Sequence, residues 1–219
     1  MSAAQEQPTT SLGAPAPTHP ILRRVVTLLR CVWYWPMLLG RPLAYKSRSR
    51  IDHDVARWVE VTSPDLPTLL GLLGTYPEFR TLYCYRLRRG GIASAAVGAV
   101  FKVCFPGERT LLLQCSDIGG GLFIQHGFAT VVAARKVGER CWINQQVTIG
   151  FDRPDSRPTL GDNVSVHAGA KVLGDIHIGD GARVGANAVV LHDVPGGYTA
   201  VGIPARVLPP KSQRGTARS

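Results

Sequence analysis

Six histidines are the side chains of this sequence best suited to acid–base chemistry near neutral pH, and His126 differs from the others by its position. It interrupts a six-residue repeat within Gln125-His126-Gly127. An imidazole at such a break could take the proton of a hydroxyl group while that hydroxyl attacks a carbonyl carbon. His167, His177 and His192 fall at different phases of the repeat, so no three-histidine metal site is expected.

The five cysteines offer little catalytic or metal-binding pattern. Their number is odd, and no two are spaced as C-x-x-C. This argues against a disulfide framework and against a zinc site. A reducing, cytoplasmic location is the corresponding expectation.

Aliphatic residues that recur every six positions indicate the elements that must position His126. The twelve members are Ile118, Ile124, Val131, Val137, Ile143, Ile149, Leu160, Val166, Val172, Ile178, Val184 and Val190. Neither the helical period of 3.6 nor the strand period of 2 explains this step. A six-residue period is typical of a parallel β-helix, and twelve hexads make about four coils if three form one turn.

The repeat breaks twice, and such breaks in a solenoid become loops that often bind ligands. One extra residue separates Ile124 from Val131, at His126. Eleven residues separate Ile149 from Leu160, and the polar stretch 150–159 fills that gap. A functional site is therefore expected near these two breaks.

The chain divides by composition into four parts. Residues 1–20 are predicted to be a disordered tail, residues 21–110 an α-helical region, residues 111–207 the β-helix and residues 208–219 a basic tail. Within the helical region, residues 21–39 predict a helix that Pro36 ends or bends. Further helices are expected around Asp65–Leu73, Phe79–Arg89 and Ile92–Phe105.

The net charge of +10 is concentrated in the N-terminal half. Ile21, Val25, Leu28 and Val32 form one apolar face of the first helix, and a basic run from Arg41 to Arg50 follows it. Such a helix could lie on an anionic membrane, or it could simply pack on its own domain. No stretch is apolar enough to span a bilayer, and only the charge would suggest a nucleic-acid partner, which is not expected.

Several segments together resemble the serine acetyltransferase-like branch of the hexapeptide-repeat acyltransferases. They are 118–132 around Gln125-His126-Gly127, 141–150, 158–164, 168–174, 184–190 and 201–206. The resemblance implies a left-handed β-helix, a homotrimer, acetyl-CoA as co-substrate, no metal, and His126 as general base. It also places Ala168, Gly169, Ala186 and Arg206 along the CoA groove.

The sequence departs from this family at positions that would hold an amino-acid acceptor. Gln125 replaces an Asp, Ser156-Arg157 replaces Arg-His, and Leu111 replaces the acid that orients the histidine. Asp54, Asp152 and Asp155 remain alternative partners for His126, and Gln125, Arg157 and Asp152 are predicted to contact the acceptor.

These departures favour the polysaccharide-modifying relatives, which implies acetylation of a sugar hydroxyl in an exopolysaccharide, a capsule or a precursor. The first alternative is L-serine O-acetylation, and the second is a non-catalytic trimeric scaffold.

Overall fold

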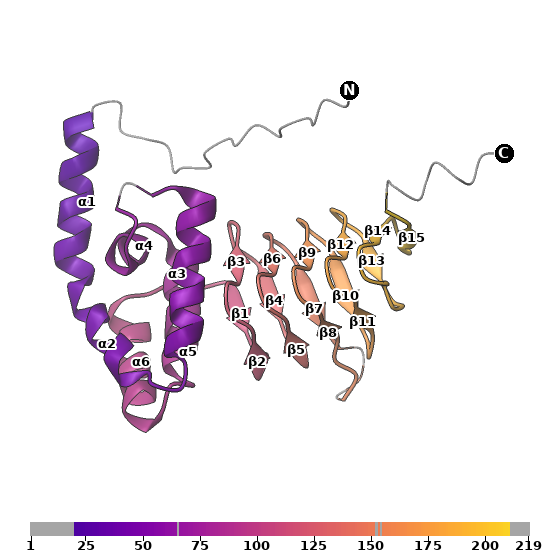
Figure 1. Ribbon diagram of the computed structural model, residues 1–219, viewed down its shortest axis with the longest axis horizontal. Helices are drawn as coiled ribbons and strands as arrows, with labels where there is room; N and C mark the ends of the chain where they lie inside the picture. Colours follow the sequence, from indigo (N-terminus) through magenta and orange to yellow (C-terminus); the bar gives the residue numbers. More distant parts are fainter. Residues whose placement is uncertain (1–19, 65, 152, 154, 211–219) are drawn as a thin grey trace.

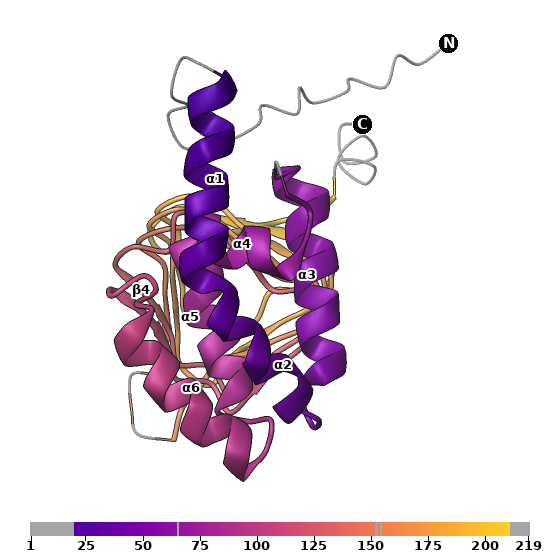
Figure 2. The same cartoon turned by 90° about the vertical axis from the view of Figure 1, so that its left-hand side faces the viewer.

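The computed structural model describes residues 20–64, 66–151, 153 and 155–210, which form a helical part followed by a β-solenoid (Figure 1). Asp152, residues 1–19 of the predicted N-terminal tail and residues 211–219 of the C-terminal tail lie outside the described residues. The helices gather at one end of the solenoid, as the views along and across the long axis show (Figures 1 and 2).

The helical part confirms the N-terminal helical region expected from the sequence. Its elements are α1 (Pro20–Tyr34), the 3-10 helix η1 (Trp35–Leu39), α2 (Gly40–Leu43), α3 (Arg48–Thr62), α4 (Leu69–Thr75), α5 (Pro77–Leu87) and α6 (Ile92–Cys104). The first helix ends just before Pro36, because proline cannot continue the α-helical hydrogen-bond ladder. Thr68 begins α4 by accepting the Gly71 amide at 3.2 Å.

The solenoid consists of three sheets whose strands follow one another in turn around each coil. Sheet A holds β1 (Leu111–Leu113), β4 (Thr130–Val132), β7 (Thr148–Gly150), β10 (Lys171–Leu173) and β13 (Val189–Val190). Sheet B holds β2 (Asp117–Ile118), β5 (Lys136–Val137), β8 (Thr159–Leu160) and β11 (His177–Ile178). Sheet C holds β3 (Phe123–Ile124), β6 (Trp142–Ile143), β9 (Ser165–Val166), β12 (Arg183–Val184), β14 (Thr199–Val201) and β15 (Arg206–Leu208).

The pairing confirms a parallel β-solenoid. Each strand pairs in parallel with its counterpart one coil away, and only β14 and β15 pair antiparallel. The added strands β1 and β14 extend the four predicted coils at both ends. The left-handed sense of the coil stays a prediction of the resemblance.

The solenoid interior is built from the predicted aliphatic residues, with one exception. Eleven of the twelve are buried, but Val131 is only half-buried and its neighbour Val132 is fully buried. The choice of Val131 was wrong because Val132, not Val131, pairs with the interior residue Ile149. A second interior column, two residues earlier in each hexad, contains Leu122, Cys141, Val147, Val164, Ala170, Ala182 and Ala188.

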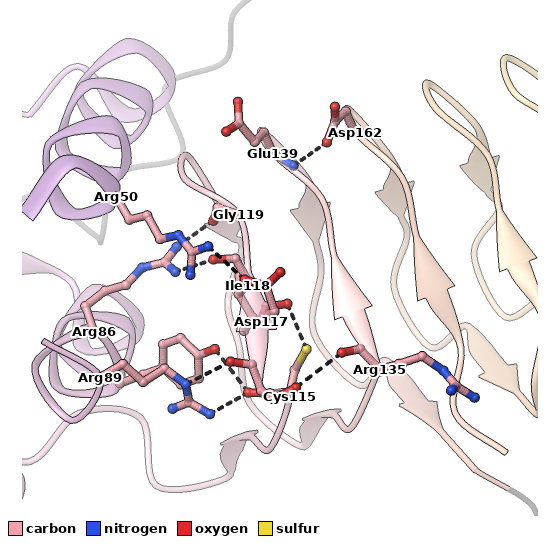
Figure 3. Close-up of polar contacts among 12 residues, drawn as sticks. Arg50, Arg86, Arg89, Cys115, Asp117, Ile118, Gly119, Arg135, Glu139 and Asp162 are labelled. Carbon is pink, nitrogen blue, oxygen red and sulfur yellow. Dashed lines mark hydrogen bonds and ion pairs between the residues drawn. The ribbon is translucent and has the colours of Figure 1, made fainter. Parts of the chain in front are cut away.

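A buried ion pair between Asp54 of α3 and Arg86 of α5 contacts the first coil, and Figure 3 shows Arg86 reaching the carbonyls of Ile118 and Gly119. Arg86 of α5 donates to both carboxylate oxygens of Asp54, at 2.8 and 3.1 Å, and also to the carbonyls of Ile118 and Gly119. Asp54 in turn accepts the amides of Gly121 and Leu122. The first coil has no preceding coil to satisfy these groups, so the helices cap the open end of the solenoid.

Candidate active site

His126 lies at the corner that leads from sheet C to sheet A, between β3 and β4. Gln125 lies level with Asn144 of the next coil, because its amide donates to the Ile143 carbonyl at 2.8 Å. Val131 pairs with Thr148. Residues 126–129 therefore occupy the corner that residues 145 and 146 occupy in the next coil. The His126 corner has two extra residues, so the single extra residue predicted between Ile124 and Val131 was too few.

The extra residues hold His126 away from the solenoid wall. Its side chain is exposed, and its φ of 58° lies in the left-handed region that few non-glycine residues adopt. Positive φ recurs at the same corner in the following coils, at Gln146, Gly169, Asn187 and Gly202. We call this edge, formed by residues 125–129, 144–146, 167–169, 185–187 and 202–205, the C–A corner.

Three of the predicted CoA-binding residues lie on the C–A corner in successive coils. The Gly169 amide donates to the Gln145 carbonyl at 3.0 Å, and the Asn187 amide donates to the Ala168 carbonyl at 2.9 Å. Ala186 is exposed beside Asn187. Arg206 is exposed at the start of β15, next to Ala205, whose amide donates to Val189. The structure therefore brings Ala168, Gly169 and Ala186 to the same edge as His126, and Arg206 follows the last residue of that edge.

Gly169 shows how closely the coils approach at this edge. A Cβ atom added there would stand 2.0 Å from Asn187 Oδ1, and the φ of 73° already favours glycine. Ala168 and Gly169 are half-buried and Ala186 is exposed, so this part of the corner is lined by small residues. A narrow extended ligand could approach the backbone amides here.

An acidic side chain that the sequence did not single out reaches the His126 corner. Glu78, half-buried in the first turn of α5, places its Cγ 3.0 Å from the position that a Cβ on Gly127 would occupy. Leu111 lies 3.2 Å from the same position and offers only an apolar side chain. Burial raises the pKa of the Glu78 carboxyl and Glu108 raises it further, whereas the neighbouring charge of His126 lowers it.

The three aspartates considered as partners of His126 do not take that place in the described residues. Asp54 is buried at the corner between β2 and β3, where Arg86 and two amides occupy its oxygens. Asp155 is exposed in the loop between sheets A and B, where its carbonyl accepts from Arg135. Asp152 lies outside the described residues. The pairing of His126 with Asp54 was therefore wrong, because Arg86 and two amides already occupy the Asp54 oxygens. Within one chain, Asp155 lies at a different corner from His126.

Two polar side chains next to His126 have unused acceptors. The Asn144 amide nitrogen donates to Gln125 Oε1 at 3.1 Å, which fixes Gln125 beside the histidine. Asn144 Oδ1 and Gln145 Oε1 are buried without a hydrogen-bond partner among the described residues. A buried carbonyl oxygen without a donor is costly, so a ligand that supplies N–H or O–H groups would stabilise this corner.

Arg157 belongs to a different corner from His126 within one chain. It lies in the loop between β7 and β8, on the edge between sheets A and B, and its guanidinium stacks 4.7 Å from the centre of the Phe151 ring. Within the described part of the chain, no group of three or more His, Cys, Asp or Glu side chains could hold a metal ion.

Comparison with known proteins agrees with this architecture. The family of bacterial transferase hexapeptide repeats (six repeats) matches residues 157–192. The serine acetyltransferase of Helicobacter pylori strain J99 is 40% identical over 143 residues, which cover 61% of this chain and 82% of that enzyme. The chain belongs to the serine acetyltransferase family.

Other members of the serine acetyltransferase family extend the comparison. The enzyme of Synechococcus elongatus is 40% identical over 147 residues, and the chain spans only 60% of its length. A solved serine acetyltransferase in complex with CoA matches with a TM-score of 0.57 at 23% identity, covering 91% of this chain and 81% of that one. At that identity, the solved structure supports the fold alone.

Family membership corrects the predicted acceptor. The expectation of a sugar hydroxyl in a polysaccharide was wrong, because relatives at 40% identity are serine acetyltransferases. The expected sugar acceptor rested on three local departures from the family, at Leu111, Gln125 and Ser156-Arg157. The similarity to serine acetyltransferases extends over 143 residues. The structure offers a physical reason for two of these departures: Glu78 and Asn144 lie at the corner where Leu111 and Gln125 replace acids.

Proposed function

We propose that this protein transfers the acetyl group of acetyl-CoA to the hydroxyl of L-serine, with His126 as general base. The observation that carries the proposal is the position of His126 at the head of the C–A corner, in line with Ala168, Gly169 and Ala186. An exposed imidazole next to an extended edge lined by small residues suits a small hydroxyl acceptor and a long thioester donor.

The reaction requires no covalent intermediate on the protein. His126 takes the proton of the serine hydroxyl as its oxygen attacks the thioester carbonyl carbon. The tetrahedral intermediate then collapses, the carbon–sulfur bond breaks, and the imidazolium returns the proton to the CoA thiolate. General base catalysis of this kind contributes about 10²–10⁴-fold to the rate.

Glu78 is the acid that we assign to His126. A carboxylate beside an imidazole orients the ring and stabilises the imidazolium that forms during attack. Leu111 cannot supply this charge, whereas Glu78 reaches the same corner from α5. The unused oxygens of Asn144 and Gln145 would accept hydrogen bonds from the serine ammonium group or from amides of the pantetheine arm.

The remaining residues of the C–A corner would bind the donor. Ala168, Gly169 and Ala186 leave room for the pantetheine arm against the backbone, and Arg206 could pair with a phosphate of CoA. Because acetyl-CoA is a co-substrate of this reaction, it would be bound and released in each cycle. The cytoplasmic location stays a prediction and is consistent with five free cysteines.

A homotrimer would complete the site. Arg157 and His126 lie on different corners of one solenoid, so Arg157 can contact an acceptor at His126 only if a neighbouring subunit provides it. We therefore place Gln125 and the neighbour's copy of the 150–159 loop around the acceptor. A mass three times that of the chain in light scattering is the expected result.

The deciding experiment follows the loss of the acetyl-CoA thioester with purified protein and L-serine. D-serine and L-alanine serve as controls for stereochemistry and for the hydroxyl group. The wild-type protein should turn over with L-serine alone, and His126→Ala should lose about 10²–10⁴-fold in kcat while still being stabilised by CoA. Stabilisation by CoA with no turnover of L-serine would favour the non-catalytic scaffold instead.

A further inference from the structure

The apolar face of α1 points away from the protein. Val25, Leu28 and Val32, three of the four residues that form this face in the sequence, are 44%, 65% and 70% exposed. The opposite side of α1 packs on α4, where the Cβ of Arg30 lies near Gly74, and Tyr34 contacts Phe105. The helix therefore uses its other face for packing and leaves its most hydrophobic face uncovered.

The last helix of the helical part, α6, also exposes apolar side chains. Ile92, Val100 and Val103 of α6 are 94%, 57% and 81% exposed, and Lys102 is the one charged residue of the helix. Twelve of the nineteen exposed large hydrophobic side chains among the described residues lie on or next to α1, η1, α2 and α6. They are Val25, Leu28, Leu29, Val32, Trp33, Trp35, Leu39, Leu43, Tyr45, Ile92, Val100 and Val103, which we call the apolar end face.

The apolar end face lies at the end of the molecule opposite the solenoid. Seen from that end, α1, α2 and α6 stand in front of the remaining helices and the coils (Figure 2). The edge of Trp33 meets Phe105, the residue after α6, with ring centres 6.4 Å apart, so α1 and α6 form one surface. This surface is separate from the C–A corner, and apolar side chains gathered to this extent mark an interaction site.

The charge around the apolar end face is of one sign. Residues 25–51 contain no Asp or Glu, and their cations are Arg30, Arg41, Lys46, Arg48 and Arg50. Arg41 forms an ion pair with Asp52, and Arg50 forms an ion pair with Asp117. A cleft of about 450 Å³ opens beside α6, and Arg88, Lys102 and Arg109 line it together with Glu108.

The combination of exposed apolar side chains and nearby cations favours one kind of partner for the apolar end face. A second copy of the chain would bring two cationic faces together, which costs free energy when the charges are not compensated. The bilayer interface accepts apolar and aromatic side chains, and anionic headgroups attract the adjacent cations. Trp33, Trp35 and Tyr45 are of the type that concentrates at that interface.

We propose that the apolar end face docks the protein on the surface of an anionic membrane, with the solenoid directed away from the bilayer. None of the helices within the described residues is long and apolar enough to cross a bilayer. The 15 residues of α1 extend about 22 Å, short of the roughly 30 Å hydrocarbon core. The association is therefore peripheral.

Vesicle co-sedimentation of the full-length protein tests this proposal without acetyl-CoA or serine, so the result does not depend on the proposed reaction. The protein should sediment with vesicles that contain phosphatidylglycerol and stay in solution with pure phosphatidylcholine vesicles. High salt should weaken sedimentation because it screens the cations. Leu29→Glu combined with Val32→Glu should lower vesicle binding at least tenfold, since it places two acids at the interface.

The matched control places the same charges on the solenoid. Leu191→Glu combined with Val207→Glu changes two exposed apolar residues, 46% and 39% exposed, and should leave vesicle binding unchanged. Circular dichroism would verify that both variants fold. Two results would overturn the proposal: no binding to anionic vesicles, or a halved molecular mass in light scattering for the α1 variant, which would show that a second copy covers this face.

Discussion

At the residue scale, the proposed pairing of His126 with Glu78 makes a specific kinetic prediction. Glu78→Gln keeps the size of the side chain but removes its charge beside His126. We expect kcat to fall roughly 10- to 100-fold with little change in KM, because a hydrogen bond or ion pair to a charged group is worth about 1.5–3 kcal/mol. The low-pH limb that follows ionisation of the Glu78 carboxyl, whose pKa burial raises, should be lost, because glutamine does not titrate.

Two further variants separate this role from a general effect of charge. Glu78→Asp should restore part of the activity because it returns the carboxylate. Glu108→Gln removes an acid that raises the pKa of Glu78 and binds Thr110, so it should only move the low-pH limb slightly to lower pH and leave kcat at neutral pH unchanged. A rise in the KM for serine with an unchanged pH profile in Glu78→Gln would instead assign Glu78 to substrate binding.

The residue scale also shows where sequence reasoning was insufficient. His126 could be found because it breaks a regular repeat, which is a signal along the chain. Glu78 could not be found this way, because it approaches Gly127 from a helix 49 residues earlier and no spacing connects the two. Val131 and Val132 are equivalent in type, and only pairing with Ile149 decides which one enters the interior.

At the element scale, the cap of the solenoid depends on the Asp54–Arg86 pair between α3 and α5. Asp54→Ala would leave Arg86, which is 1% exposed, without a counter-charge and would leave the amides of Gly121 and Leu122 without an acceptor. We expect the free energy of unfolding to fall by about 3–5 kcal/mol, as for other buried ion pairs that lose one partner. Chemical denaturation followed by circular dichroism measures this change.

A matched control lies two residues earlier on the same helix. Asp52 pairs with Arg41 at 2.7 Å, but their side chains are 45% and 38% exposed. Asp52→Ala should cost no more than about 1 kcal/mol, because water already screens this pair. Equal losses for Asp54→Ala and Asp52→Ala would mean that the buried pair does not stabilise the cap.

The two kinds of element differed in how far the sequence could predict them. The coils repeat, so their period and most of their interior residues could be read from aliphatic spacing. The start of α3 was hidden within the basic run 41–50, and α3 was expected only as part of a broad helical region. The function of the cap was also not predictable, because Asp54 and Arg86 meet unpaired backbone groups of a coil more than thirty residues away.

At the scale of the whole molecule, the five cysteine thiols differ in how deeply the helical part and the solenoid bury them. Cys104 is exposed at the end of α6, and Cys31 is half-buried on α1. Burial raises the pKa of Cys84 to about 11 and that of Cys141 to about 12, and it also raises the pKa of Cys115. Because the thiolate is the reactive form, a thiol reagent at neutral pH should label Cys104 first and leave the three interior thiols unmodified until the protein unfolds.

The same pKa shifts fix the direction of a pH effect on stability. A thiol whose pKa is raised by folding keeps its proton in the native state while the unfolded chain releases it, so its contribution to stability is lost as the pH rises through the folded pKa. Unfolding free energy measured by denaturant should therefore decline from about pH 9 towards pH 12. Cys141→Ala, which also loses packing volume, should be less stable at neutral pH yet show a flatter decline above pH 9. Rapid labelling of Cys141 in the folded protein would contradict the burial of the second interior column and, with it, the register of the solenoid that aligns the C–A corner.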